Sequence, residues 1–191
     1  MEPSDLDLWK AAVHGDHGAF HTLVDRHARG LFRVAVSLSA TRSDAEDICQ
    51  ETFAAAYKGL RGFDGRASVK TWLTRILMRR AAKIWNKQRN ARRTISLYRE
   101  DAAGEERNHE TNGGVLPGKA SAAATVDVDT RMDVMNVIRQ LPGEFRDVVV
   151  LREIDGLSYQ EIADTLGLPR GTVESRLHRA RAELRRRLTG Y

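Results

Sequence analysis

Arginine side chains crowd a short segment near the end of the 191-residue sequence, where they could bind phosphates and nucleic-acid bases. Seven arginines lie between positions 170 and 187, and only Glu174 and Glu183 oppose them. On a helix, early polar residues can reach base edges in the major groove of DNA, while later cations hold phosphates. A solvated surface helix is the plainer alternative for such a charge run. The large excess of arginine favours a nucleic-acid partner.

The residues around this segment have the pattern of a helix-turn-helix. Ser158 and Glu161 form a capping box that starts a short helix. Gly167 and Pro169 end that helix, and a second helix restarts near Arg170. The second helix repeats apolar residues at steps of three and four, which predicts one buried face. That face consists of Val173, Leu177, Ala180, Leu184 and Leu188.

A second basic surface is expected on a helix that starts at Val69, with Ser68 as its N-cap, and ends near residue 90. Residues 66–99 contain no acidic side chain. Trp72 and Trp85 interleave with the cations, and aromatic rings among cations suit the unstacked bases of a single strand. For either tryptophan alone, helical spacing makes core packing the better interpretation.

An acidic cluster opens an earlier helix. Ser43 and Glu46 form another capping box, and the helix is expected to run to about Leu60. The cluster consists of Asp44, Glu46, Asp47, Gln50 and Glu51. Acids in a first turn are explained in part by the helix dipole, but an acidic patch on a basic chain also suits docking of a basic protein helix. The residues alone leave both interpretations open.

Neither a metal site nor a catalytic centre is predicted. His14, His17 and His21 have helical spacing, but two glycines fall among them and no further ligands complete a set. We therefore expect solvated side chains there, and no metal or cofactor. There is no glycine-rich phosphate loop and no nucleophile with a matching histidine and acid, so the chain is not expected to be an enzyme.

Composition predicts a soluble, cytoplasmic protein, and the helical spacing of its apolar residues predicts an all-α fold. The net charge is +5 and 41% of the residues are hydrophobic, which favours an acidic partner and excludes general disorder. Cys49 is the single cysteine, so no disulfide framework exists, and no secretion signal or membrane span is evident. Residues 94–125 are small, polar and glycine-rich, as in a flexible linker. We predict two small helical domains, residues 1–93 and the helix-turn-helix domain 126–191.

Two long stretches resemble one protein family. Residues 141–188 resemble the promoter-reading C-terminal domain of bacterial RNA polymerase sigma factors of the extracytoplasmic-function (ECF) group. Residues 43–89 resemble the N-terminal domain of the same group, in the same order along the chain. The resemblance implies a sigma factor that binds core RNA polymerase, directs promoter-specific initiation and is controlled by an anti-sigma factor.

The resemblance also implies three groups of site residues. Polymerase binding is implied for Asp44, Glu46, Asp47, Gln50 and Glu51. Reading of the duplex upstream promoter element is implied for Arg170, Thr172, Glu174, Ser175, Arg176, His178 and Arg179. Melting and single-strand binding of the downstream element are implied for Phe63, Arg66, Lys70, Trp72, Arg75, Arg79, Arg80, Lys83 and Lys87.

Two departures from the family pattern predict altered promoter preferences. Arg79 stands where many relatives have asparagine, and Glu174 stands where a basic residue is frequent. A glutamate can accept a hydrogen bond from a cytosine amino group but repels a nearby phosphate. The alternative function is a stand-alone helix-turn-helix repressor or activator, which would need a dimerisation element and a palindromic site. No heptad seam supports that alternative.

Overall fold

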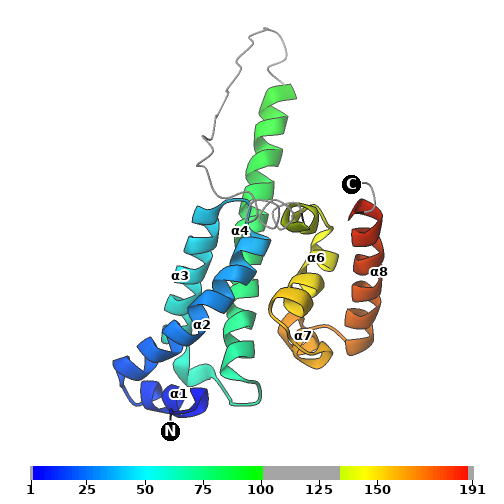
Figure 1. Cartoon of the computed structure of the whole chain (residues 1–191). Coiled ribbons are helices and arrows are strands. Elements are labelled where there is room, and N and C mark those ends of the chain that lie inside the picture. The colour runs from blue at the N-terminus through cyan, green and yellow to red at the C-terminus, as the bar shows by residue number, and fades with distance from the viewer. Residues whose placement is uncertain (1, 101–133, 189–191) are drawn as a thin grey trace, which may run out of the picture.

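The computed structural model describes residues 2–100 and 134–188, and within these ranges it is helical, without strands (Figure 1). The first helical unit contains α1 (Asp5–Val13), α2 (His17–Leu38), α3 (Arg42–Lys58), a 3-10 turn η1 (Leu60–Gly62) and α4 (Val69–Glu100). The second contains helical residues 134–139, then α6 (Gly143–Val149), the π-helical turn η2 (Val150–Ile154), α7 (Tyr159–Leu166) and α8 (Arg170–Leu188). The predicted all-α fold with two helical units is confirmed.

Local capping signals position the helices that carry the basic surfaces. The Ser158 hydroxyl accepts from the Glu161 amide, and the Glu161 carboxylate accepts from the Ser158 amide at 2.9 Å, so both arms of the capping box are present. Gly167 ends α7 in the left-handed conformation, with φ of 66°. The Ser68 hydroxyl accepts from the Thr71 amide at 3.0 Å at the start of α4. These three predictions are confirmed.

Two predicted boundaries differ from the structure. Thr41, and not Ser43, caps α3, because its backbone is extended and its hydroxyl accepts from the Asp44 amide at 3.1 Å. Glu46 therefore pairs with Arg42 instead of closing a capping box. Helix α4 also continues to Glu100, past residue 93, because neither glycine nor proline interrupts residues 91–100. The remainder of the expected linker, from residue 101, lies outside the described residues.

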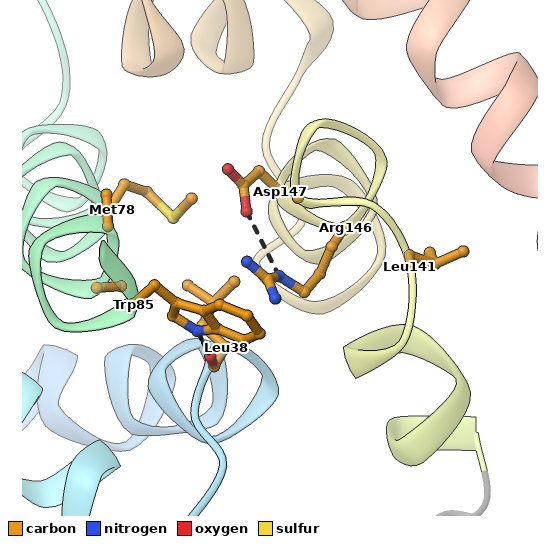
Figure 2. A pocket seen from close by; sticks show the side chains of 9 residues that line it. Leu38, Met78, Trp85, Leu141, Arg146 and Asp147 are labelled. Atoms are coloured by element: carbon orange, nitrogen blue, oxygen red, sulfur yellow. Dashed lines mark hydrogen bonds and ion pairs between the residues drawn. The ribbon is translucent and has the colours of Figure 1, made fainter. Parts of the chain in front are cut away.

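The two units pack directly against each other. The guanidinium carbon of Arg146 in α6 lies 3.9 Å from the centre of the Trp85 ring in α4, a cation–π contact (Figure 2). Asp147 faces the same guanidinium at 3.7 Å. Burial lowers the pKa of Arg146 and raises that of Asp147, while their mutual attraction opposes both shifts. These side chains, together with Leu38 and Met78, line a cavity of about 260 Å³ between the units.

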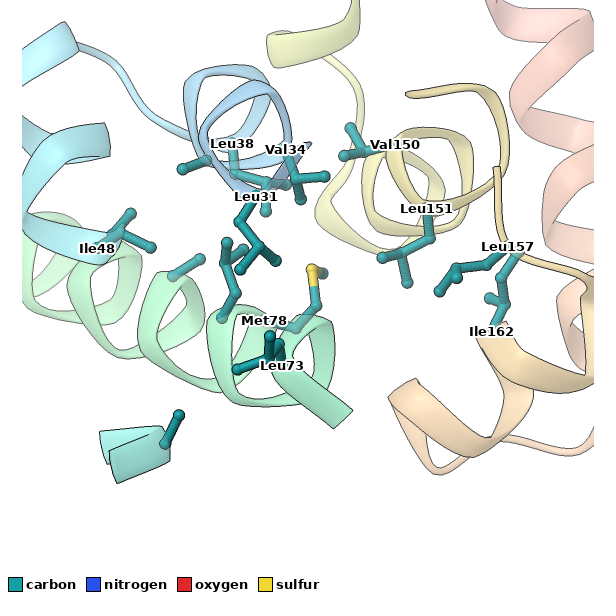
Figure 3. Close-up of a cluster of buried hydrophobic side chains, with 14 of the residues drawn as sticks. Leu31, Val34, Leu38, Ile48, Leu73, Met78, Val150, Leu151, Leu157 and Ile162 are labelled. Atoms are coloured by element: carbon teal, nitrogen blue, oxygen red, sulfur yellow. The ribbon is translucent and has the colours of Figure 1, made fainter. Parts of the chain in front are cut away.

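A shared apolar core continues this contact (Figure 3). Val34 in α2 is fully buried, as is Val150 in η2, and α2 packs on η2. Val150 and Leu151 lie in one cluster of buried residues with Leu31, Val34 and Met78. The sequence predicts two domains on a tether, and the structure adds that they form a single core.

No helix in the described ranges combines the length and apolar content needed to cross a bilayer.

Cys49 is half-buried in α3, and burial raises the pKa of its thiol to about 11.

Candidate nucleic-acid and protein interfaces

Helix α8 buries the first part of its predicted apolar face and exposes a polar ridge. Leu184 is only partly buried, and Leu188 is 38% exposed, so the predicted burial of Leu188 is wrong. Val173, Leu177 and Ala180 are at most 1% exposed and hold the helix against α6 and α7. The exposed side chains on the first turns are Arg170, Glu174, Ser175, His178 and Arg179. An exposed ridge on the second helix of a helix-turn-helix is the surface that enters a major groove.

Most arginines of α8 already have acidic partners within the chain. Arg170 pairs with Glu174 at 3.0 Å, and Arg181 pairs with Glu153 at 2.7 Å. Glu183 accepts from both Arg186 and Arg187 at 2.7 Å, and these hydrogen bonds lower its pKa to about 2.

Arg176 and Arg179, both predicted to contact DNA, differ in their surroundings. Arg176 is turned toward α6, where it pairs with Glu144 at 3.3 Å, and Thr172 is partly buried. The side chains of His178 and Arg179, by contrast, make no hydrogen bond or ion pair within residues 2–100 and 134–188. These two side chains are therefore the ones most available to a base edge.

A groove of about 350 Å³ lies beside α4, between it and the end of α3. Trp72 and Ile76 form its apolar wall, and its basic rim consists of Arg79, Arg80 and Lys83. Arg80 lies 3.6 Å from Glu51. Arg79 and Lys83 are exposed, and neither side chain is paired in the described part of the chain. An indole beside unpaired cations can stack a base and hold its phosphate.

The remaining predicted downstream residues fall into different environments. Phe63 is buried, 6% exposed, with its ring 5.0 Å from Trp9 and 5.3 Å from Trp72. It supports the loop from inside, where its ring is covered, and its contact with DNA stays a prediction. Arg66 is exposed beside Asp64, whereas the Nε of Arg75 is buried and has no hydrogen-bond partner among the described residues.

Lys70 points away from the groove toward the second unit, where it pairs with Asp155 at 3.1 Å. No local sequence pattern marks Asp155 or predicts this contact. The side chain of Lys87 lies outside the described residues.

Helix α3 presents its acidic cluster on one exposed side. Glu46, Asp47, Gln50 and Glu51 are exposed, and Asp44 is partly exposed. Ala45, Ile48 and Thr52 are fully buried on the opposite side. The acids therefore form a continuous surface away from the core, which suits a basic partner.

The three histidines do not converge on one point. His14 contacts the Lys10 carbonyl at 2.8 Å, His17 contacts the Tyr57 hydroxyl at 2.8 Å, and His21 pairs with Asp25 at 3.0 Å. In the described residues, no group of three or more histidine, cysteine or acidic side chains could hold a metal ion.

Comparison with known families matches both halves of the chain. Residues 23–91 match Sigma-70 region 2, and residues 131–184 match Sigma-70, region 4. The first match covers α3 and the α4 groove, and the second covers the helix-turn-helix.

Curated relatives match over nearly the whole length. The ECF RNA polymerase sigma factor SigM of Mycobacterium tuberculosis is 36% identical over 190 residues, which covers 100% of this chain and 87% of that protein. SigW of Bacillus subtilis is 31% identical, covering 94% of each chain. The solved structure of CnrH in complex with the cytosolic domain of CnrY is 28% identical, with a TM-score of 0.69 and 96% of each chain covered. The chain belongs to the ECF group of bacterial RNA polymerase sigma factors.

Proposed function

We propose that this sigma factor directs core RNA polymerase to promoters through three separate surfaces. The acidic side of α3 binds the polymerase, the ridge of α8 reads duplex DNA upstream, and the α4 groove holds the melted strand downstream. The chain acts as a specificity subunit and not as a catalyst, and its place of action is the cytoplasm, with the polymerase.

One observation carries this proposal. Each matched family region holds exposed basic side chains that no acid of the described residues pairs: Arg79 and Lys83 beside Trp72, and His178 and Arg179 on α8. A phosphate-binding groove with an indole suits a single strand, and an exposed ridge on a recognition helix suits a duplex.

A regulating partner is part of the proposal. CnrH, which is similar to this chain over its whole length, was solved with the cytosolic domain of CnrY bound. We infer that this chain also binds a protein partner, and that this partner is an anti-sigma protein that holds the chain inactive.

Run-off transcription from fragmented genomic DNA tests the function. Core bacterial polymerase with this chain is expected to start at a few sites that core enzyme alone does not use. Alignment of the sequences upstream of those starts gives both promoter elements. If active core enzyme makes no new transcript, the proposal is wrong and a stand-alone regulator takes its place.

Asp47→Lys tests the polymerase surface in a binding assay. Reversing the charge on the exposed side of α3 should impair holoenzyme assembly in a pull-down with core polymerase, because an acid that attracts a basic partner becomes a cation that repels it. Asp25→Lys makes the same charge change on an exposed position of α2 and is the matched control. Equal assembly of both variants would contradict the docking role of α3.

A further inference from the structure

Three hydrogen-bonding side chains at the start of α4 are occupied by acids of the second unit. Lys70 Nζ lies 3.1 Å from Asp155 Oδ1 and also donates to the Asp155 carbonyl. The Thr74 hydroxyl donates to Asp155 Oδ2 at 2.9 Å. The Thr71 hydroxyl donates to Glu161 Oε1 at 2.9 Å. Both carboxylates therefore contact the same two turns of α4.

The chemistry of this contact matches that of a phosphate contact. An ammonium and two hydroxyls on adjacent helical turns are typical ligands of the nucleic-acid backbone. Carboxylate oxygens carry a similar charge and accept the same hydrogen bonds as phosphate oxygens. Asp155 and Glu161 thus accept from α4 the kind of hydrogen bonds that phosphate oxygens accept.

The Asp155 carboxylate is buried only because the two units pack together. The side chain of Asp155 is only 3% exposed, although Asp155 follows the exposed end of η2. Its side-chain partners, Lys70 and Thr74, both belong to the other unit. A buried carboxylate needs such partners, since an unpaired buried charge is strongly destabilising. Separating the two units would instead expose Asp155 to water.

We propose that Asp155 and Glu161 act as an internal substitute for DNA, holding the free chain in a closed state that covers the first turns of α4. This inference rests on the proposed function for the role of α4 in binding DNA, but the closed state itself does not. Binding of a single strand at this end of α4 then requires the helix-turn-helix unit to move away.

The closed state covers one DNA surface and leaves the other interfaces accessible. His178 and Arg179 remain exposed on α8, and the acids of α3 remain exposed on the first unit. Polymerase can therefore dock on α3 before the units separate. Closure covers the Lys70, Thr71 and Thr74 side of α4, while Arg79 and Lys83 beside the groove and the upstream duplex contacts stay available.

Two variants release the contact without altering the groove cations. Asp155→Asn keeps the shape of the side chain but removes its charge, and Thr74→Val removes the donor from the opposite side. Glu153→Gln, on the same turn as Asp155 but paired with Arg181 within its own unit, is the matched control. Circular dichroism checks that each variant keeps its helix content.

Conformation is measured first, independently of any DNA. Spin labels on Lys58→Cys and Ala182→Cys, both exposed positions, in a Cys49→Ser background report the distance between the units by pulsed electron resonance. We expect one narrow distance distribution for the parent and Glu153→Gln, and a broader, longer one for Asp155→Asn and Thr74→Val. Identical distributions for all four would overturn the closed state.

Binding of a fluorescent twenty-nucleotide oligothymidine then tests the covering of α4. Asp155→Asn should bind this strand about tenfold more tightly than the parent, because the apparent affinity scales with the open fraction. Unchanged binding despite a longer distance would refute the substitution for DNA but would leave the closed state standing. A run-off assay without new transcripts would instead refute the proposed function and leave the distance result standing.

Discussion

The basic surfaces of α8 and α4 differ in how many of their cations are paired with acids. On α8, acids of the same chain pair with Arg170, Arg181, Arg186 and Arg187, so that a few unpaired side chains remain on the ridge. On α4, no acid of the described residues pairs with Arg79 or Lys83 beside the groove. A surface with few unpaired groups discriminates by where they point, whereas a surface of bare cations attracts any phosphate. The difference supports the proposal that α8 reads sequence and that α4 holds the melted strand.

Removing the bare cations of α4 should have the largest effect. Arg79→Ala with Lys83→Ala should weaken binding of oligothymidine about tenfold or more. The slope of log affinity against log salt should fall by about 0.7 for each phosphate that the variant no longer neutralises. Fluorescence anisotropy over a salt series measures both. Arg186→Ala on α8, which removes a cation that is paired with Glu183, should leave the slope unchanged.

Arg179→Ala should weaken binding of the upstream duplex by about 1 to 3 kcal/mol if this side chain contacts a base edge. The loss should disappear when the contacted base pair is changed, which a set of singly substituted duplexes reveals. Arg181→Ala is the control, since Arg181 is held by Glu153. A loss of equal size on every duplex would make Arg179 a phosphate contact and weaken the contrast between the surfaces.

Ser158→Ala should lower the free energy of unfolding by about 1 kcal/mol, because the first turn of α7 loses its cap. Urea denaturation followed by circular dichroism measures this change. The same variant should reduce upstream duplex binding and leave the α4 groove unaffected. Ser175→Ala, which removes an exposed hydroxyl that bonds only within α8, should hardly change stability.

The smallest expected effect is a loss of the stabilising contribution of Glu183 at low pH. Its pKa is lowered to about 2 in the folded chain from 4.5, so its contribution to stability is complete above pH 4.5 and is lost as the pH falls toward 2. The difference in urea midpoint between the parent and Glu183→Gln should therefore shrink over this interval. A constant difference from pH 6 to pH 2 would contradict the pairing with Arg186 and Arg187.

Local signals explain what could be predicted from the sequence. Ser68, Ser158 and Gly167 act within one helical turn, so their roles follow from neighbouring residues, and helical spacing predicts the buried face of α8. Competition between nearby caps explains the error at α3, where Thr41 takes the place of Ser43.

Contacts between distant residues could not be predicted in the same way. Lys70 and Asp155 are 85 positions apart, and nothing in either neighbourhood marks the other. The burial of Phe63 likewise depends on Trp9, which comes from a separate helix. The candidate site was therefore predicted as a set of residues, but its division into covered and accessible parts was not.

The core shared by α2 and η2 has a consequence for the lifetime of the chain. Small helical units bury a smaller fraction of their apolar surface when they stand alone, and they open more often. Once the units separate, each must persist without Val34 packed near Val150. Proteases cut the transiently open form of a protein, so a closed chain should survive longer than an open one that has no polymerase. The closed state then protects the free chain from proteolysis, whereas a chain that opens without polymerase is degraded sooner.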